Sequence, residues 1–186
     1  GVNLDINKRK LSKLNNEVPF SIESVNETVV KQIALGIKND MPVLIKGQTG
    51  VGKTSLIRHL ANKTNNTFFR INLNGSTGTD EVVGRWLLND KGTFWVDGPL
   101  LTAMRNGYWL LVDEINAASP ELDFVFHSLL DDDRFVRVVE KDGESVNPHK
   151  DFRFFAAMNP HESGYAGTKE LNPAFISRFP IVVDYG

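Results

Sequence analysis

A glycine-rich segment, Gly47-Gln-Thr-Gly-Val-Gly-Lys-Thr54, constrains the fold of this chain more than any other feature. It matches the phosphate-binding pattern G-x-x-x-x-G-K-[ST] at every fixed position. Glycines let the backbone wrap closely around phosphate oxygens and point successive N–H groups inward. The sequence therefore predicts that this loop binds a nucleotide, through Gly47, Gln48, Thr49, Gly50, Val51, Gly52, Lys53, Thr54 and Ser55.

The residues on both sides of the loop have the pattern that such a loop requires. Residues 41–46 form an apolar run of strand length, and residues 53–61 place apolar side chains at helical spacing. A helix that begins near Gly52 adds the positive end of its dipole to the loop. We expect Lys53 to reach the β and γ phosphates and the Thr54 hydroxyl to ligate Mg²⁺.

Strand and helix patterns alternate along the rest of the chain. Ser24-x-x-Glu27 has the form of a capping box for the first helix, and Ser119-Pro120 is typical of the start of a later one. The alternation predicts an α/β domain with a mostly parallel sheet over residues 21–186, after a polar extension at 1–20. Further strands are predicted at 67–73, 108–112, 152–158 and 181–184, a hairpin at 134–151, and helices at 25–38, 79–83, 99–106, 120–130 and 173–178.

Composition excludes several other classes of protein. With 41% hydrophobic and 24% charged residues the chain is an ordinary globular protein rather than a disordered tail. Cysteine is absent, which excludes thiolate chemistry and fits a reducing cytoplasm, where we expect the protein. No apolar run approaches the roughly 18–20 residues that cross a bilayer. The net charge of -2 gives no general attraction to nucleic acid.

Two carboxylates, Asp113 and Glu114, follow the apolar run 108–112. In a parallel sheet that strand can end beside the phosphate loop, in the same crevice. Asp113 would then hold the hydration shell of Mg²⁺, and Glu114 would orient and deprotonate the attacking water. The alternative is a solvated acidic pair before Ser119. A small-molecule kinase needs no carboxylate to activate water, so the pair favours hydrolysis over transfer to a metabolite.

With both motifs in place, residues 20–186 resemble an AAA+ ATPase of the MoxR branch, CbbQ/NorQ type, within the dynein-related subfamily. The resemblance implies a P-loop NTPase core of α/β class that hydrolyses ATP with Mg²⁺. The motifs that carry it are Val83-Gly-Arg-Trp-Leu-Leu88, Gly92-Thr-Phe-Trp95, Asp97-Gly-Pro-Leu100, Asp113-Glu-Ile-Asn116 with Ala118 and Pro120, Leu129-Leu-Asp-Asp132, Met158-Asn-Pro160 and the segment from Gly164 to Phe179. The phosphate loop and the Asp-Glu motif are generic to P-loop ATPases, and the last two motifs are much more specific.

The resemblance also implies roles for two residues late in the chain. Asn159 matches sensor 1, whose amide would hydrogen-bond the γ-phosphate or the attacking water; the alternative is an Asn-Pro turn. Arg178 matches the arginine finger, which would reach the γ-phosphate bound to a neighbouring subunit. The alternative for Arg178 is a cation at the end of a short helix. Arg153 and Arg70 are lesser rivals for the finger.

Other parts of the resemblance concern the surroundings of the site. Residues 84–98 correspond to an insert in the second helix and 134–151 to the hairpin before sensor 1, and both face the pore of such rings. Trp86, Phe94 and Trp95 would then grip a substrate chain, or else fill the domain's own core. Asn72 or Asn74 is expected to restrain the catalytic Glu, and the adenine pocket to lie near residues 19–22.

AAA+ proteins also carry a helical lid after the α/β core, with a sensor 2 arginine. This sequence ends at Gly186, just after the last core strand, so we expect the lid to be absent from the chain.

The leading hypothesis is an ATP-hydrolysing enzyme that assembles with itself into a ring, expected to be hexameric, and remodels a client protein. Relatives often work with a partner that bears a von Willebrand A domain. One alternative is a nucleic-acid-directed motor of restriction type that uses GTP, although the net charge of -2 argues against nucleic acid as a partner. The other is a module that binds nucleotide with little turnover.

Overall fold

The computed structural model describes residues 21–160 and 173–186. The predicted extension at 1–20, the first two residues of the expected adenine pocket and the motif residues 164–172 lie outside these ranges. The strands of the main sheet are β1 (Val43–Lys46), β2 (Phe68–Asn72), β5 (Trp109–Asp113), β8 (Arg153–Met158) and β9 (Ile181–Asp184). The α-helices are α1 (Glu27–Lys38), α2 (Lys53–Lys63), α3 (Thr79–Val82), α4 (Pro99–Asn106), α5 (Pro120–Leu130) and α6 (Pro173–Ile176).

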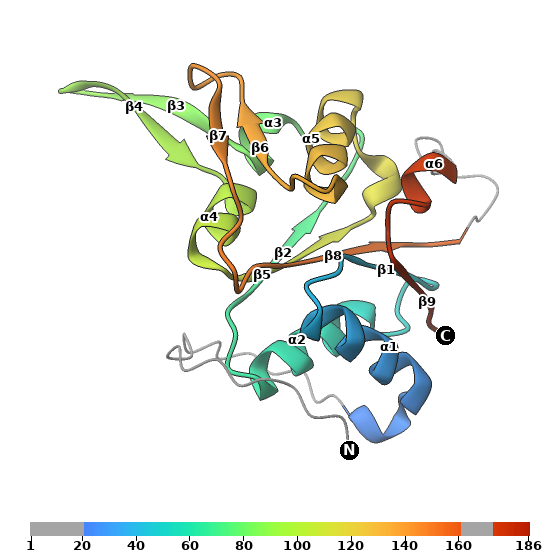
Figure 1. Cartoon of the computed structure of the whole chain (residues 1–186). Helices are drawn as coiled ribbons and strands as arrows, with labels where there is room; N and C mark the ends of the chain where they lie inside the picture. Colours follow the sequence, from blue (N-terminus) through green and yellow to red (C-terminus); the bar gives the residue numbers. More distant parts are fainter. Residues whose placement is uncertain (1–20, 161–172) are drawn as a thin grey trace.

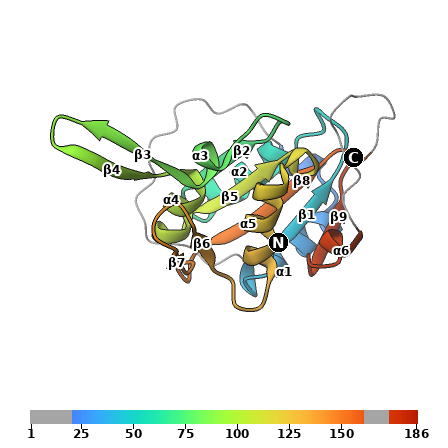
Figure 2. The ribbon, with the colours of Figure 1, turned by 90° about the horizontal axis from the view of Figure 1, so that it is seen from above.

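The main sheet is parallel throughout, with the strand order β2-β5-β8-β1-β9. Helices α1 and α2 cover one face, and α3, α4 and α5 lie on the other (Figures 1 and 2). The predicted α/β fold with a mostly parallel sheet is confirmed. Because the strands run in the same direction, the residues that follow β1, β5 and β8 all emerge at the same edge of the sheet.

Side chains alternate between the two faces of each strand and fill two separate cores. Trp109 and Leu111 of β5 pack toward α1 and α2, whereas Leu110 and Val112 pack toward α4 and α5. The ring of Trp109 lies 5.5 Å from that of Phe155 on β8, centroid to centroid. Burial on both faces explains why the sequence of β5 is a continuous apolar run.

Residues 84–98 form an antiparallel hairpin of β3 (Gly84–Asn89) and β4 (Gly92–Asp97), which projects from the body between α3 and α4 (Figures 1 and 2). Trp86 lies opposite Trp95, with their rings 5.6 Å apart in an edge-to-face contact. Trp95 packs partly buried against the core, but Trp86 is 46% and Phe94 40% exposed. Trp95 therefore packs against the domain's own core, whereas Trp86 and Phe94 are exposed to solvent.

The second hairpin pairs β6 (Val136–Val138) with β7 (Glu144–Val146), as predicted for 134–151. The start of α5 follows the prediction, because the Ser119 side chain accepts a hydrogen bond from the Leu122 N–H. Helix α4 spans the predicted residues 99–106, and Gly107 ends it with a φ of 67°. None of the helices in the described part of the chain is long and apolar enough to cross a membrane.

The predicted capping box at Ser24 is wrong. Helix α1 begins two residues later than expected, at Glu27, and the side chain of Asn26 accepts the hydrogen bond from the Thr28 N–H at 2.8 Å. Ser24 ends a preceding 3₁₀ turn, η1 (Ile22–Ser24), and its hydroxyl donates to the Ser21 carbonyl instead. Asn and Ser are comparable N-caps, so the local turn decided between them.

Arg153, a rival for the arginine finger, lies at the opposite edge of the sheet from the loop. Its Nε donates to the Ile37 carbonyl at the end of α1 (2.6 Å), and its Nη1 donates to the carbonyls of Phe152 and Lys150. Asp40 lies 3.5 Å from the same guanidinium. These contacts make Arg153 a structural tie between α1 and β8.

Replacing Arg153 by Met is expected to lower the free energy of unfolding by about 2–4 kcal/mol, because the bonded carbonyls lose a charged donor. Chemical denaturation monitored by tryptophan fluorescence measures the change. Arg137→Met, at an exposed position on β6, serves as the matched control and should change stability by less than about 0.5 kcal/mol. Equal effects of the two substitutions would contradict the structural role of Arg153.

Candidate nucleotide-binding site

The glycine-rich loop is anchored to both neighbours of β1. The Gly47 N–H donates to the Met158 carbonyl at the end of β8 (3.1 Å), and the Tyr185 N–H donates to the Lys46 carbonyl (2.7 Å). Gly50 and Gly52 have φ values of 86° and 95°, in the left-handed region that favours glycine. Gly52 is also the N-cap of α2, so the helix dipole points its positive end at the loop.

Lys53 is buried, with 7% of its surface exposed, and its ammonium group lies inside the loop. It donates to the carbonyl oxygens of Gly47 and Gln48, the latter at 2.9 Å. Burial lowers the pKa of Lys53, and the negative charges of Asp113 and Glu114 act in the opposite direction. The loop therefore holds a cation at the place where a phosphate-binding lysine is required.

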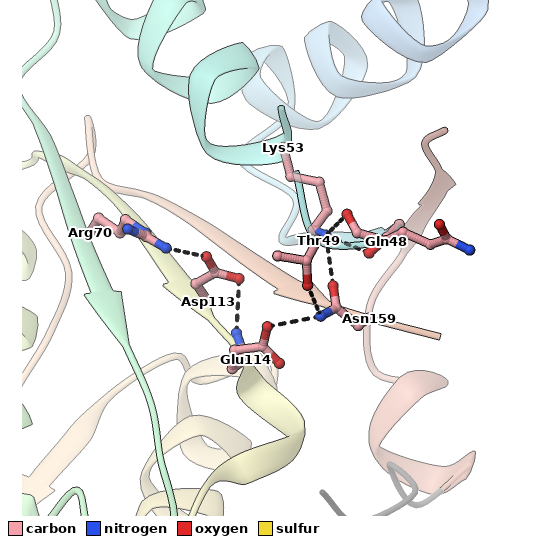
Figure 3. A network of polar contacts seen from close by, with 8 residues as sticks. Gln48, Thr49, Lys53, Arg70, Asp113, Glu114 and Asn159 are labelled. Atoms are coloured by element: carbon pink, nitrogen blue, oxygen red, sulfur yellow. Dashed lines mark hydrogen bonds and ion pairs between the residues drawn. The ribbon is translucent and has the colours of Figure 1, made fainter. Parts of the chain in front are cut away.

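Asn159 connects the loop to the carboxylates, as Figure 3 shows. Its Oδ1 accepts from the Lys53 ammonium at 2.9 Å, and its Nδ2 donates to the Thr49 hydroxyl oxygen at 2.6 Å and to Glu114 Oε1 at 3.1 Å. An amide can accept from a cation and donate to an anion at the same time. Asn159 thus links the loop cation to a carboxylate across the crevice.

The two carboxylates occupy different environments. Asp113 is buried, with 8% exposed; its Oδ1 accepts from the Glu114 N–H at 3.0 Å and its Oδ2 from Arg70 Nη2 at 2.6 Å. Glu114 has a φ of 55° and turns its side chain toward Asn159 (Figure 3). Burial raises the pKa of Glu114, as does the charge of Asp113, whereas Lys53 and Arg70 oppose the rise. A carboxylate with a raised pKa is a better proton acceptor for water.

The oxygens present suit Mg²⁺ bound together with a nucleotide. Thr54 follows Lys53 in the first turn of α2, and Asp113 is the last residue of β5, so the candidate ligands are a hydroxyl and a carboxylate. The described residues include no group of three or more His, Cys, Asp or Glu that could enclose a metal ion alone. Mg²⁺ typically binds through one or two such oxygens, with water and phosphate supplying the rest.

The structure brings together most of the residues predicted for the site, but not Arg178. Its guanidinium forms an ion pair with Asp131 at the end of α5, and none of its hydrogen bonds or ion pairs within the described residues reaches the loop or the carboxylates. Arg178 is partly exposed. The pKa of His127 is lowered mainly by the burial of its ring and secondly by the positive charge of Arg178. Within the described residues, Arg178 therefore contacts the end of α5 and not the loop of its own chain.

Sequence reasoning did not find the contact between Arg70 and Asp113. In the sequence Arg70 is only a rival for the arginine finger, and no local pattern indicates the contact, which arises because β2 pairs with β5. Asn74 was expected to restrain Glu114, but its side chain accepts from the Ser76 N–H in a turn. Among the described residues, the hydrogen-bond partner of the Glu114 side chain is Asn159, not Asn72 or Asn74.

A known protein family matches most of this chain. The profile of the AAA domain (dynein-related subfamily) matches residues 42–179. The chain belongs to this family. Membership of this AAA+ family implies, in general, binding of a nucleotide with Mg²⁺.

Individual relatives support the assignment. Midasin of Dictyostelium discoideum is 40% identical over 139 residues, which are 74% of this chain and 2% of midasin. Protein NorQ of Paracoccus denitrificans is 33% identical over 164 residues, 88% of this chain and 58% of NorQ. Protein CbbQ of Hydrogenophilus thermoluteolus is 33% identical over 151 residues, 81% of this chain and 55% of CbbQ. These matches confirm the resemblance to the CbbQ/NorQ type of the MoxR branch.

Solved structures show the same fold. A putative ATPase from Cytophaga hutchinsonii superposes with a TM-score of 0.68 at 20% identity, covering 87% of this chain and 47% of that protein. The chain spans about half the length of NorQ and of the Cytophaga hutchinsonii protein, and 2% of the length of midasin.

The anchoring of the loop leaves no room for a side chain at Gly47. A Cβ atom there would lie 2.1 Å from the Tyr185 carbonyl oxygen. Gly47→Ala is expected to lower the free energy of unfolding by about 2 kcal/mol or more and to weaken nucleotide binding, because loop and β9 must separate. Gly75→Ala is the control, since a Cβ at Gly75 meets nothing within 4 Å. Thermal melts and titration with a fluorescent ADP analogue measure both effects; an unchanged Gly47 variant would contradict the loop geometry.

Proposed function

We propose that this chain is the catalytic core of an ATPase that hydrolyses ATP at the loop 47–54. The observation that carries the proposal is the hydrogen-bonded connection from Lys53 through Asn159 to Glu114. This connection supports the proposal because a cation that could hold the phosphates, an amide that could bind the attacking water and a carboxylate that could take its proton are joined by hydrogen bonds. A site that only bound nucleotide would have no use for the last two groups.

In the proposed reaction the loop N–H groups and Lys53 hold the β and γ phosphates. A water molecule attacks the γ-phosphorus, the bond between that phosphorus and the bridging oxygen breaks, and Glu114 takes the proton of the water. ADP and phosphate leave, and the proton returns to solvent. Mg²⁺, held through Thr54 and Asp113, would neutralise charge on the phosphate oxygens.

Asn159 is proposed to link nucleotide binding to the readiness of Glu114. Its amide bonds both Lys53 and Glu114, so a γ-phosphate that engages Lys53 or Asn159 would compete with the bond that holds Glu114. Glu114 would then be free to turn toward water. The raised pKa of Glu114 supports its role as the acceptor of the proton.

Glu114→Gln tests the hydrolytic step separately from binding. The amide cannot accept the proton, so turnover should fall by about a hundredfold or more, whereas ATP affinity should stay within about threefold because the loop is intact. Phosphate release and a fluorescent-nucleotide titration measure the two quantities. Glu121→Gln, exposed on α5, is the matched control. Wild-type turnover in the Glu114 variant would overturn the proposal, and negligible turnover in both it and the wild type would favour a binding module.

We further propose that the active form is a ring of identical subunits and that Arg178 acts in the site of a neighbour. The support is the position of Arg178: it is partly exposed, lies outside its own network, and its ion-pair partner Asp131 is itself exposed. A cation supplied by a partner stabilises charge on the γ-phosphate as the transition state forms.

Mixing two inactive variants tests this arrangement. Lys53→Ala loses the phosphate cation and Arg178→Ala loses the finger, so each alone should lose most of its activity. In the mixture some interfaces combine an intact loop with an intact finger, and up to about a quarter of wild-type turnover should return, as expected for independent random pairing in a transferred-finger mechanism. Sedimentation under the same conditions reports assembly. No recovery together with a monomeric active species would overturn the ring.

For the client, we propose a protein rather than nucleic acid. The support is the near-neutral net charge and the apolar side chains that the β3–β4 hairpin exposes, Trp86 and Phe94 among them. A partner that bears a von Willebrand A domain is the first class to test, on the ground of family resemblance.

A further inference from the structure

Arg70 and Asp113 come from neighbouring strands and meet on one face of the sheet. In the parallel register of β2 and β5, Arg70 pairs with Leu111 and Asn72 with Asp113. Paired residues point to the same face, so Arg70 and Asp113 both lie on the face that α2 covers. Figure 3 shows the Arg70 guanidinium pointing toward the carboxylate of Asp113.

Both oxygens of the Asp113 carboxylate accept hydrogen bonds, one from the Arg70 guanidinium and the other from the backbone. Arg70 Nη2 lies 2.6 Å from Oδ2, and the Glu114 N–H donates to Oδ1. The remaining cation of the site, Lys53, is bonded to the loop carbonyls and to Asn159. Among the described residues, Arg70 is thus the cation that contacts Asp113 directly.

The Arg70–Asp113 ion pair differs from an ordinary surface salt bridge because one of its two side chains is buried. An exposed pair contributes little to stability, and the Arg70 side chain is 41% exposed, but its partner is only 12% exposed. Losing the guanidinium would leave a buried carboxylate next to Glu114 with one oxygen unbonded and its charge uncompensated. The loss of Arg70 would therefore change the charge and the hydrogen bonding of Asp113, the carboxylate that is proposed to hold the metal.

We propose that Arg70 is a positioning residue for Asp113: it fixes the orientation of the carboxylate and offsets part of its charge, so that Mg²⁺ binds there in one geometry and reversibly. This inference rests on the proposed function, because it assigns Asp113 to the metal. It predicts two effects of opposite sign when Arg70 is lost. Removing a nearby positive charge strengthens Mg²⁺ binding, whereas the loss of a fixed orientation slows turnover.

The test measures metal binding without turnover. With a saturating fluorescent ADP analogue, Mg²⁺ is titrated into wild-type protein, Arg70→Met and Arg70→Lys. Arg70→Met should lower the half-saturating Mg²⁺ concentration by about three- to tenfold and reduce ATP turnover by about fivefold or more. Arg70→Lys keeps the charge but loses the planar fork, so its half-saturation should stay within about twofold while turnover falls.

Arg58→Met is the matched control. Arg58 lies over the ring of Phe68 at 5.6 Å on the same face of the sheet, so its loss removes one positive charge without touching Asp113. If Arg70→Met shifts the Mg²⁺ titration no more than Arg58→Met does, the proposal is overturned. The proposal is also overturned if Arg70→Met weakens the binding of Mg²⁺ and of the nucleotide to the same extent and lowers the melting temperature of the protein. That result would indicate that Arg70 only stabilises the fold.

The Mg²⁺ titration also separates this inference from the proposed function. A wild-type protein without any Mg²⁺-dependent nucleotide binding would remove both. A wild-type protein that binds and hydrolyses ATP, beside an Arg70→Met variant with unchanged metal half-saturation and turnover, would remove only the role of Arg70.

Discussion

The parallel pairing of β1 with β8 determines where the groups of the site lie. Their register sets Lys46 beside Met158, so the next residues, Gly47 and Asn159, leave the sheet side by side. The hydrogen bond from the Gly47 N–H to the Met158 carbonyl extends this pairing into the loop. Lys53 and Asn159 therefore meet although they are far apart in sequence. On its other side β1 pairs with β9. Position 47 accepts only glycine, because a Cβ atom there would collide with the carbonyl oxygen of Tyr185, which follows β9.

The chemistry of the crevice depends on the amide of Asn159. It faces an ammonium group on one side and a carboxylate on the other, and it satisfies both because an amide carries an acceptor and donors. A carboxylate at this position would add a third negative charge beside Asp113 and Glu114. An apolar residue would leave the buried ammonium with fewer acceptors. The residue type follows from the two charges that it separates.

Features written in contiguous residues could be predicted from the sequence. The loop, its flanking strand and helix, and the pair Asp113–Glu114 all depend on short spacings, and the structure places them together. Ser24 shows the limit of this reasoning, because two acceptable N-caps stood close together and only the turn at 22–24 separated them. The hairpin at 84–98 was not predicted, because it depends on the pairing of two exposed strands with each other.

Contacts between distant segments could not be derived in this way. Arg70 became a partner of Asp113 only when the order of the strands put β2 beside β5, and nothing in its own neighbourhood indicates that contact. The ion pair of Arg178 with Asp131 likewise joins a loop after α6 to the end of α5. The sequence motifs therefore identify residue types, and the topology decides which charges meet.

The balance of charge within the crevice bears on why a second subunit would be needed. Lys53 and Arg70 face Asp113 and Glu114, so the side chains of the network offset one another and leave little net positive charge for a triphosphate. The loop N–H groups and Mg²⁺ supply part of what is missing. In the proposed ring, Arg178 of a neighbouring subunit would supply a further cation, and to do so it would have to leave Asp131. The proposed exchange of Arg178 between Asp131 in its own subunit and a γ-phosphate in the next would tie hydrolysis to assembly.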